Sequence, residues 1–231
     1  MRAIVLVGGQ ATRLRPLTDT IPKALIELQG KTILEHVLDL FKKYAITDIT
    51  LSVGYLKEQI ISHFGDGQKF GLQISYLEET EPLGTAGPLR LLPQKMTETF
   101  VVCNGDELKQ IDFDAMLAQH RATSATATLA LTTVLDPSMY GVARLEGTKI
   151  LEFVEKPKRE EAPSNYINAG FYLLEPSVLD LIPAGRAMFE YDVFPKLAAA
   201  GTLHGFVFIG QWFDTGNFER LEHARRTWRG L

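Results

Sequence analysis

The sequence of 231 residues has almost no cysteine, no excess of positive charge and no long apolar run. Its single cysteine, Cys103, excludes a disulfide framework and a metal cluster built from several cysteines, and it indicates a reducing compartment. A formal net charge of −4 excludes the basic surface with which nucleic-acid-binding proteins contact phosphates. The apolar run at residues 3–7 is too short for a signal-peptide core, and no run approaches the ~20 residues of a membrane span. We therefore expect a cytoplasmic protein with neither a membrane nor a nucleic-acid partner.

Apolar residues make up 45% of the chain, and in its first half they form short runs that alternate with helical patterns. We expect strands at residues 3–7, 48–53, 72–77, 99–103 and 126–133. We expect helices at residues 32–44, 57–64, 85–92 and 114–121. This succession predicts an α/β fold, a Rossmann-like three-layer α/β/α architecture with a mostly parallel, mixed sheet.

The pattern changes beyond Pro137. Strand patterns at residues 142–145, 149–154 and 166–174 are separated by short turns, which predicts antiparallel pairing. Helices are expected at residues 176–182, 188–200 and 217–228, and a strand at residues 203–209. The chain contains no internal repeat and no obvious linker, so we expect a single domain over residues 1–231.

The start of the helix expected at residues 32–44 is well defined. Thr32 and Glu35 match the T-x-x-E pattern of a capping box. Ile33, Val37 and Leu40 follow at helical spacing and predict the buried face.

A loop rich in glycine and positive charge, residues 8–23, follows the first expected strand. Gly8 and Gly9 allow backbone N–H groups to approach a ligand, and Arg13, Arg15 and Lys23 add positive charge. Ligands bind at the carboxyl ends of parallel strands, so the loop is a candidate phosphate site, although two glycines alone also fit a tight turn. The loop contains neither the G-x-x-x-x-G-K-[ST] of a P-loop nor the G-x-G-x-x-G of a dinucleotide fold.

Six further motifs follow this loop in a fixed order. They are E-P-L-G-T-A-G at residues 81–87, N-G-D at 104–106, Y-G-V at 140–142, E-K-P at 155–157, N-A-G at 168–170 and W-F-D-T-G at 212–216. Together with the loop they resemble the signature of the sugar-1-phosphate nucleotidylyltransferases. Within that family, the strings EPLGTAGPL and INAGFYLL are most similar to the mannose-1-phosphate guanylyltransferases. Alanine stands at position 11, where the family usually has a third glycine. A positive φ there would cost alanine about 1 kcal/mol.

The resemblance implies an enzyme that transfers a nucleotidyl group from an NTP to a sugar 1-phosphate and releases pyrophosphate, with Mg²⁺ as its cofactor. GTP and mannose 1-phosphate are the preferred pair. Glucose-1-phosphate thymidylyl or uridylyl transfer, heptose-1-phosphate guanylyl transfer and a homo-oligomeric state remain open. The resemblance also implies the fold of the nucleotide-diphospho-sugar transferases, here without the carboxyl-terminal β-helix domain of longer relatives.

The family's site residues are assigned to the matching positions of this sequence. The nucleotide-binding residues are Gly8, Gly9, Gln10, Ala11, Thr12, Arg13, Lys23, Glu79, Gly84, Thr85 and Asp106. Those that bind the sugar phosphate are Gly141, Glu155, Lys156 and Asn168. The catalytic residues are Arg13 for the leaving pyrophosphate, Lys23 for the α-phosphate, and Asp106. Asp106 and Asp214 are the metal ligands, and two carboxylates suit an Mg²⁺ that also binds phosphates and water.

Glu79 is the residue expected to select the base. A carboxylate accepts both the N1–H and the N2–H₂ donors of guanine, whereas uracil or thymine suits glutamine better. Guanine is therefore modestly favoured, with Glu78 and Glu81 as neighbouring acids that blur the assignment.

Two functions of other classes compete with nucleotidyl transfer. Asp112 and Asp114 form a D-x-D string, by which many glycosyltransferases hold a sugar nucleotide. This string precedes an expected helix, so we interpret one or both aspartates as helix caps. The other alternative is a non-catalytic, sugar-nucleotide-binding regulatory homologue, which a lost metal aspartate would favour, and both aspartates are present.

Overall fold

The computed structural model describes residues 1–231, which form two compact units. Unit 1 consists of residues 1–82, 103–110 and 210–231, and unit 2 consists of residues 83–102 and 111–209. Each unit has its own strands and helices and is described by itself. The single domain expected over residues 1–231 stays a prediction.

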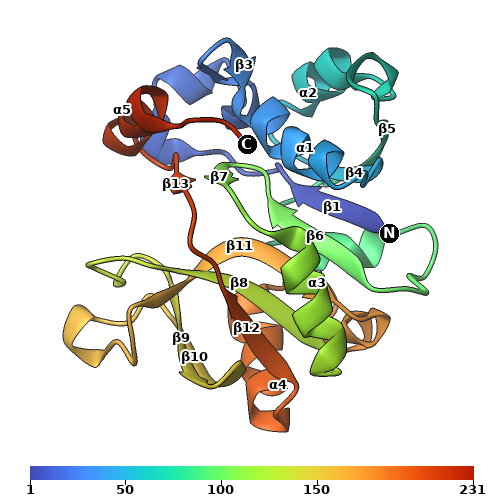
Figure 1. Cartoon of the computed structure of the whole chain (residues 1–231). Helices are drawn as coiled ribbons and strands as arrows, with labels where there is room; N and C mark the ends of the chain where they lie inside the picture. The colour runs from blue at the N-terminus through green and yellow to red at the C-terminus, as the bar shows by residue number, and fades with distance from the viewer. The chain divides into compact units, whose positions relative to one another are not determined.

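Unit 1 contains parallel strands and three helices. Strand β4 (Asp48–Val53) pairs in parallel with β1 (Arg2–Leu6) and with β5 (Gln73–Glu78) (Figure 1). Two short antiparallel ladders join β2 (Glu27–Leu28) to β3 (Lys31–Thr32), and β7 (Glu107–Lys109) to β13 (Trp212–Asp214). The helices are α1 (Ile33–Lys43), which packs against β7, α2 (Lys57–Phe64), and α5 (Phe218–Thr227), which packs against β13.

Two sequence signals explain much of unit 1. Ala3, Ile4 and Val5 are completely buried, as expected for a strand that is covered on both faces. The capping box is confirmed, because Thr32 Oγ1 accepts from Glu35 N at 3.2 Å and Glu35 Oε2 accepts from Thr32 N at 2.6 Å. Two backbone N–H groups at the start of α1 therefore have side-chain partners.

Unit 2 is built mainly from antiparallel strands. Strand β6 (Phe100–Asn104) begins in this unit and ends in unit 1. The five strands that follow are β8 (Ala127–Thr133), β9 (Gly141–Glu146), β10 (Lys149–Glu155), β11 (Tyr166–Leu174) and β12 (Leu203–Val207). β11 pairs antiparallel with β8, and β10 with both β9 and β12, while β12 runs parallel to β8. Helices α3 (Phe113–Ala122) and α4 (Phe194–Ala200) pack against β12.

An aromatic cluster forms part of the core of unit 2. The rings of Phe189 and Phe194 stack at 5.3 Å between centroids, and the ring of Tyr172 meets that of Phe194 edge-on at 5.1 Å. All three side chains are completely buried. The cluster therefore fixes the chain segment before α4 against strand β11.

The predicted α/β class and mixed sheet are confirmed, and so is the antiparallel pairing beyond Pro137. Three expected helices differ. Residues 87–91 and 176–181 are 3-10 helices, and both have a proline in their first turn. The helix expected at 188–200 starts as a π-helical turn at Phe189–Val193. Pro195, which lacks an N–H group, prevents one regular α-helix from running through this point.

Ala11, which stands where the family usually has a glycine, has a left-handed backbone conformation. Its φ is 47° and its ψ is 45°, directly before the 3-10 helix at Thr12–Leu14. Thr18 Oγ1 and Leu14 N both donate to the Ala11 carbonyl, which holds the residue in this conformation. An L-residue with a Cβ is strained in this region, so a glycine would fit better.

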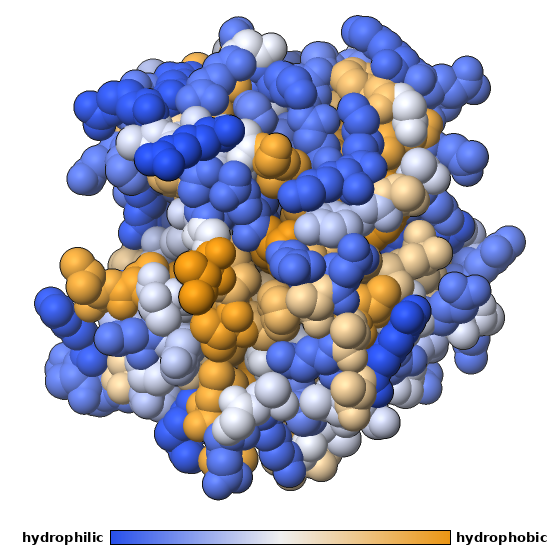
Figure 2. Space-filling model, viewed as in Figure 1, coloured by the Kyte–Doolittle hydropathy of each residue, from blue (hydrophilic) through white to orange (hydrophobic).

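The surface shows both polar and apolar groups. In Figure 2 the helices of unit 1 are largely covered by hydrophilic side chains, and apolar groups reach the surface of unit 2. Leu135, Val207 and Ile209 of unit 2 are exposed. Folded proteins commonly expose single apolar residues, so these carry no functional inference. None of the helices combines enough length with enough apolar character to cross a bilayer.

The capping box predicts a measurable loss in the variant Thr32→Ala. We expect the free energy of unfolding in urea to fall by about 1 kcal/mol, because one N-terminal N–H group of α1 loses its acceptor. Thr97→Ala is the matched control, since Thr97 is exposed and outside any helix, and should change stability by less than about 0.5 kcal/mol. Equal losses in the two variants would show that the cap contributes nothing.

The strained Ala11 predicts a gain in the variant Ala11→Gly. Relief of the left-handed strain should raise the free energy of unfolding by about 1 kcal/mol. The same substitution at Ala118, exposed within α3, should lower it by about 1 kcal/mol because glycine disfavours helix. Thermal or urea unfolding of both proteins checks the opposite signs, and a loss in both would contradict the strain.

Candidate active site

An ion pair lies just beyond the end of β6 in unit 1. Lys23 Nζ is 2.8 Å from Asp106 Oδ2. The Lys23 side chain is only 8% exposed, whereas that of Asp106 is 45% exposed. The buried ammonium is therefore neutralised by a carboxylate that solvent or a ligand can still reach.

The surrounding charges keep Asp106 ionised. Burial by itself raises the pKa of the Asp106 carboxyl, but the ammonium groups of Lys23 and Lys109 outweigh this effect. The pKa therefore lies below its usual value, and the group is a carboxylate at neutral pH.

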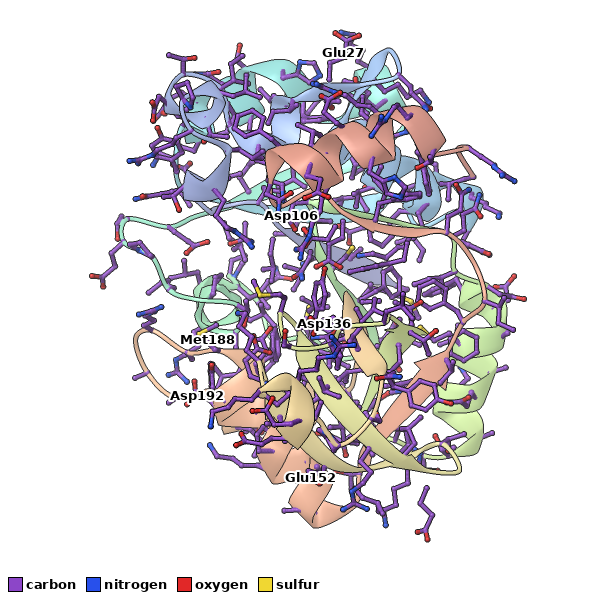
Figure 3. The ribbon with its side chains drawn as sticks, turned by 90° about the vertical axis from the view of Figure 1, so that its left-hand side faces the viewer. Glu27, Asp106, Asp136, Glu152, Met188 and Asp192 are labelled. Atoms are coloured by element: carbon purple, nitrogen blue, oxygen red, sulfur yellow. The ribbon has the colours of Figure 1, made fainter.

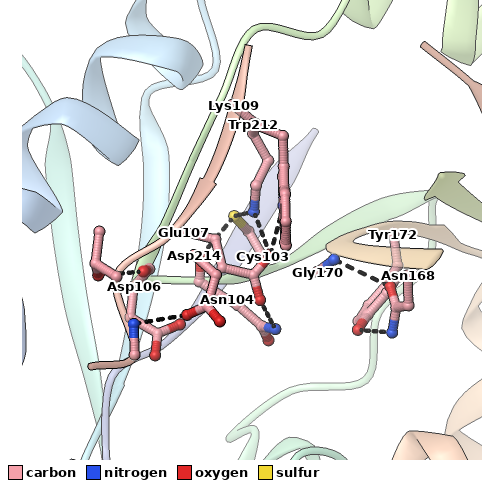
Figure 4. Close-up of polar contacts among 12 residues, drawn as sticks. Cys103, Asn104, Asp106, Glu107, Lys109, Asn168, Gly170, Tyr172, Trp212 and Asp214 are labelled. Atoms are coloured by element: carbon pink, nitrogen blue, oxygen red, sulfur yellow. Dashed lines mark hydrogen bonds and ion pairs between the residues drawn. The ribbon is translucent and has the colours of Figure 1, made fainter. Parts of the chain in front are cut away.

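The ladder between β7 and β13 brings Asp214 to this position. Asp214 lies opposite Glu107, and Thr215 Oγ1 donates to the Asp106 carbonyl at 2.7 Å (Figure 4). Asp214 Oδ1 accepts from Gly216 N at 2.6 Å, and Arg220 pairs with its other oxygen. The two predicted metal ligands thus come together within unit 1 although they are far apart in the sequence.

Glu107 and Lys109 lie in the same cluster as Asp106 and Asp214, and the motifs do not identify them as site residues. Glu107 accepts from Asn104 Nδ2 at 2.9 Å and from Trp212 Nε1 at 3.0 Å, and Lys109 Nζ lies 3.7 Å from it. Burial and the neighbouring carboxylates raise the pKa of Glu107. Only the N-G-D and W-F-D-T-G motifs around these residues signal their position.

Arg13 also lies in this part of unit 1. A Cβ built on Gly216 would meet Asp214 Oδ1 at 2.7 Å and Arg13 Nη2 at 2.9 Å. The absence of a side chain at Gly216 therefore makes room for the guanidinium beside the aspartate. The neighbouring loop residues Gly9, Gln10 and Thr12 are exposed.

Glu79 lies beside the glycine-rich loop. Ser52 Oγ donates to Glu79 Oε1 at 2.9 Å, and a Cβ on Gly8 would lie 2.6 Å from the same oxygen. Glu78, in contrast, pairs with Lys57 at 2.8 Å, and Glu81 is exposed. The structure therefore brings Glu79, and neither neighbouring acid, against the loop backbone.

The predicted nucleotide residues Gly84 and Thr85 belong to unit 2. A Cβ on Gly84, whose φ is +84°, would lie 2.4 Å from the Ala187 carbonyl oxygen. The Thr85 hydroxyl donates to Glu190 Oε2 at 2.6 Å and accepts from Phe189 N at 2.9 Å. This hydroxyl therefore contacts the π-helical turn. Figure 3 labels Asp192 within that turn and Met188 directly before it.

Glu155 and Lys156 form an ion pair of 2.8 Å at the end of β10. The Glu155 side chain is 7% exposed and that of Lys156 is 55% exposed, so the ammonium faces solvent. A Cβ on Gly141 would lie 2.8 Å from Glu155 Oε2, which brings this glycine to the pair. The hydrogen bond to Glu155 raises the pKa of Lys156.

Asn168 has partners within its own strand. Its Nδ2 donates to the Tyr172 hydroxyl at 2.8 Å, and its Oδ1 accepts from Gly170 N at 3.0 Å (Figure 4). Both contacts lie at the irregularity of β11, where its register with β8 shifts. In this structure the amide supports the strand.

The side chains of unit 1 offer some of the oxygen ligands that a hard divalent cation needs. Asp106 and Asp214 offer carboxylate oxygens, the donors that Mg²⁺ prefers. The structure contains no group of three or more histidine, cysteine or acidic side chains that could hold a metal ion. Mg²⁺ would therefore have to complete its coordination with substrate phosphates and water.

The competing D-x-D string acts as predicted. Asp112 Oδ1 accepts from Ala115 N at 3.0 Å and caps α3. Cys103 is a buried core residue, and burial raises its pKa to about 11. Asp112 is therefore used as a helix cap, and Cys103 is not accessible to a ligand.

Comparison with known proteins agrees with the motifs. A mannose-1-phosphate guanyltransferase of Yarrowia lipolytica is 42% identical over 222 residues, which cover 94% of this chain and 61% of that protein. Mannose-1-phosphate guanylyltransferase 1 of Arabidopsis thaliana is 40% identical with the same two coverages. The chain thus spans about three fifths of the length of these curated relatives.

A solved structure matches the fold of this chain, and a family model matches its sequence. A solved structure from Bacillus anthracis, of a protein assigned as a glucose-1-phosphate thymidylyltransferase, is 28% identical. It superposes with a TM-score of 0.91, and the match covers 100% of this chain and 96% of that one. The family model described as nucleotidyl transferase matches residues 2–229. The resemblance inferred from the motifs is therefore confirmed, and the chain belongs to the nucleotidyl transferase family.

Proposed function

We propose that the protein transfers a nucleotidyl group from an NTP to a sugar 1-phosphate, giving an NDP-sugar and pyrophosphate. GTP and mannose 1-phosphate are the preferred substrates, as the names of the relatives at 40% and 42% identity suggest. The observation that carries the proposal is the clustering of Arg13, Lys23, Asp106 and Asp214 in unit 1.

The reaction needs positioning and charge neutralisation more than acid–base catalysis. An oxygen of the sugar phosphate attacks the α-phosphorus, and the bond from that phosphorus to the oxygen bridging to the β-phosphorus breaks. The attacking group is already an anion, because phosphate monoesters lose their second proton near pH 6. The barrier therefore depends on holding two polyanions together and offsetting their charge.

The residues of unit 1 supply this charge. In the proposal Lys23 binds the α-phosphate, and Arg13 binds the leaving pyrophosphate. Asp106 and Asp214 hold Mg²⁺, which supplies positive charge to the phosphates when bound. The loop from Gly8 to Thr12, in which Gly9, Gln10 and Thr12 are exposed, adds backbone N–H donors for phosphate oxygens.

The residues of unit 2 hold the second substrate. Lys156, the exposed member of its ion pair, binds the phosphate of the sugar 1-phosphate. Glu155 and the backbone at Gly141 bind sugar hydroxyls. Asn168 acts in the sugar site mainly by fixing the shape of β11 through Tyr172.

A second substrate pair has its own support. The Bacillus anthracis protein that superposes at a TM-score of 0.91 is assigned to glucose 1-phosphate and thymidylyl transfer. A crossed assay distinguishes the pairs: five NTPs with mannose, glucose, N-acetylglucosamine and heptose 1-phosphates, followed by pyrophosphate release. Release that requires both substrates supports the proposal, and the best pair names the substrates. No release over the whole grid would overturn it.

The setting of the reaction is also part of the proposal. We place the reaction in the reducing cytoplasm, which suits a chain whose single cysteine is buried and unbridged.

Loss of either metal aspartate should remove the activity. Asp106→Asn and Asp214→Asn keep the side-chain size but remove a negative charge, so pyrophosphate release should fall roughly 100-fold or more. Asp112→Asn is the matched control. Asparagine caps helices as well as aspartate does, so this variant should retain full activity. Loss in Asp112→Asn with retention in the other two would indicate D-x-D glycosyltransferase chemistry instead.

Glu79 should determine the base. Glu79→Gln replaces one acceptor oxygen by a donor, so the ratio of kcat/KM for GTP over UTP should fall roughly tenfold, the order expected for one mismatched hydrogen bond. Glu78→Gln, in the acid that pairs with Lys57, should leave this ratio unchanged. An unchanged ratio in Glu79→Gln would remove the residue from base recognition.

A further inference from the structure

The segment around Thr85 and the π-helical turn of unit 2 are connected by a dense set of backbone hydrogen bonds. Ala187 N donates to the Leu83 carbonyl at 2.9 Å. The Ala187 carbonyl accepts from Ala86 N at 3.0 Å and from Gly87 N at 3.1 Å. Two short pieces of chain, about a hundred residues apart, therefore act as one element.

Two glycines make this close approach possible. A Cβ on Gly84 would lie 2.4 Å from the Ala187 carbonyl oxygen, and one on Gly87 would lie 2.8 Å from the Gly185 carbonyl oxygen. Neither contact tolerates a side chain, since backbone atoms cannot move aside cheaply. The L-G-T-A-G motif is thus explained by its packing on residues 185–190.

The side chains of Thr85 and Glu190 add a further contact between the L-G-T-A-G motif and the π-helical turn. Thr85 Oγ1 donates to Glu190 Oε2 at 2.6 Å and accepts from Phe189 N at 2.9 Å. Glu190 is buried, with 8% of its surface exposed. It lies in the π-helical turn Phe189–Val193, a rare geometry that often occurs at functional sites. Burying an ionisable group carries a free-energy penalty, so a neutral side chain would stabilise the turn better if the role were purely structural.

The π-helical turn that carries Glu190 packs against β10, and the Glu155–Lys156 ion pair lies at the end of that strand. The negative charges of Glu155 and Glu190, together with the Tyr191 side chain, favour the protonated ammonium of Lys156. In turn, burial raises the pKa of Glu190, and the nearby Glu155 raises it further. Glu155, Lys156 and Glu190 therefore form one set of interacting charges in the part of unit 2 proposed to bind the sugar phosphate.

We propose that Glu190 is a positioning residue for the sugar 1-phosphate: its carboxylate fixes the Thr85 hydroxyl and helps hold the Lys156 ammonium for the phosphate. This inference rests on the proposed function. Glu190 contacts no reacting atom and acts through Thr85 and Lys156. Its loss therefore weakens binding of the sugar substrate and leaves binding of the NTP intact.

The test compares Michaelis constants for the two substrates. Glu190→Gln neutralises the acceptor and Thr85→Val removes the donor, so each should raise the KM for mannose 1-phosphate about tenfold, the order expected for a hydrogen bond to a charged group. Glu190→Gln should leave the KM for GTP unchanged. Thr85→Ser keeps the hydroxyl and should restore the wild-type KM. The double variant should lose less than the sum of the two single losses, because both changes affect the same hydrogen bond.

A matched pair in the same unit controls for destabilisation. Thr99 Oγ1 donates to Glu175 Oε1 at 2.5 Å, so it is another threonine–glutamate contact away from the sugar-phosphate residues. Thr99→Val and Glu175→Gln should lower the melting temperature and leave both KM values unchanged. Equal changes of both KM values in Glu190→Gln, or a similar change in this control pair, would overturn the proposal.

A binding measurement keeps the inference separate from catalysis. Titration calorimetry of GDP-mannose and of GDP gives the part of the affinity that comes from the sugar. Glu190→Gln should lose about tenfold in GDP-mannose affinity and nothing in GDP affinity, the order expected for that contact. An inactive wild-type protein would contradict the proposed function alone. An unchanged ratio of the two affinities would contradict the role of Glu190.

Discussion

The pairing of a buried lysine with a partly exposed aspartate is the interaction on which the candidate site depends. An unpaired ammonium inside a protein costs several kcal/mol, so Lys23 requires Asp106 at 2.8 Å. The same pairing keeps Asp106 ionised in a region where Glu107 and Asp214 add further negative charge. Lys109, whose ammonium lies 3.7 Å from Glu107, offsets part of that charge. The result is a preorganised set of charges, which is what a reaction between polyanions needs.

A second constraint is topological. The two aspartates proposed to hold the metal can meet only because β13 returns to pair with β7, where Thr215 Oγ1 donates to the Asp106 carbonyl across 109 residues of chain. Trp212 Nε1 binds Glu107 in the same ladder. The Trp212 and Thr215 side chains of the W-F-D-T-G motif therefore stabilise the fold, whether or not a metal is bound. In unit 2 the L-G-T-A-G motif also serves two purposes. Its glycines allow the backbone to lie close to residues 185–187, and its threonine binds Glu190.

The sequence predicts local structure better than it predicts tertiary partners. Strand β4, helix α2 and strand β11 have the predicted bounds, because each combines a clear apolar pattern with turn residues at its ends. The left-handed Ala11 is also predictable, since one missing glycine in a motif signals a backbone requirement. Glu107 and Glu190 are not predictable in this way. Their importance comes from burial and from partners distant in sequence, which only the folded chain brings together.

The central claim is that a phosphate oxygen of a sugar 1-phosphate attacks the α-phosphorus of an NTP in this protein. The most direct measurement uses mannose 1-phosphate labelled with ¹⁸O in its phosphoryl oxygens, together with unlabelled GTP and Mg²⁺, followed by ³¹P NMR. The claim predicts label in the oxygen that bridges the two phosphorus atoms of GDP-mannose, with an equal amount of unlabelled pyrophosphate. Label in the pyrophosphate, or pyrophosphate released without a labelled sugar nucleotide, would contradict it.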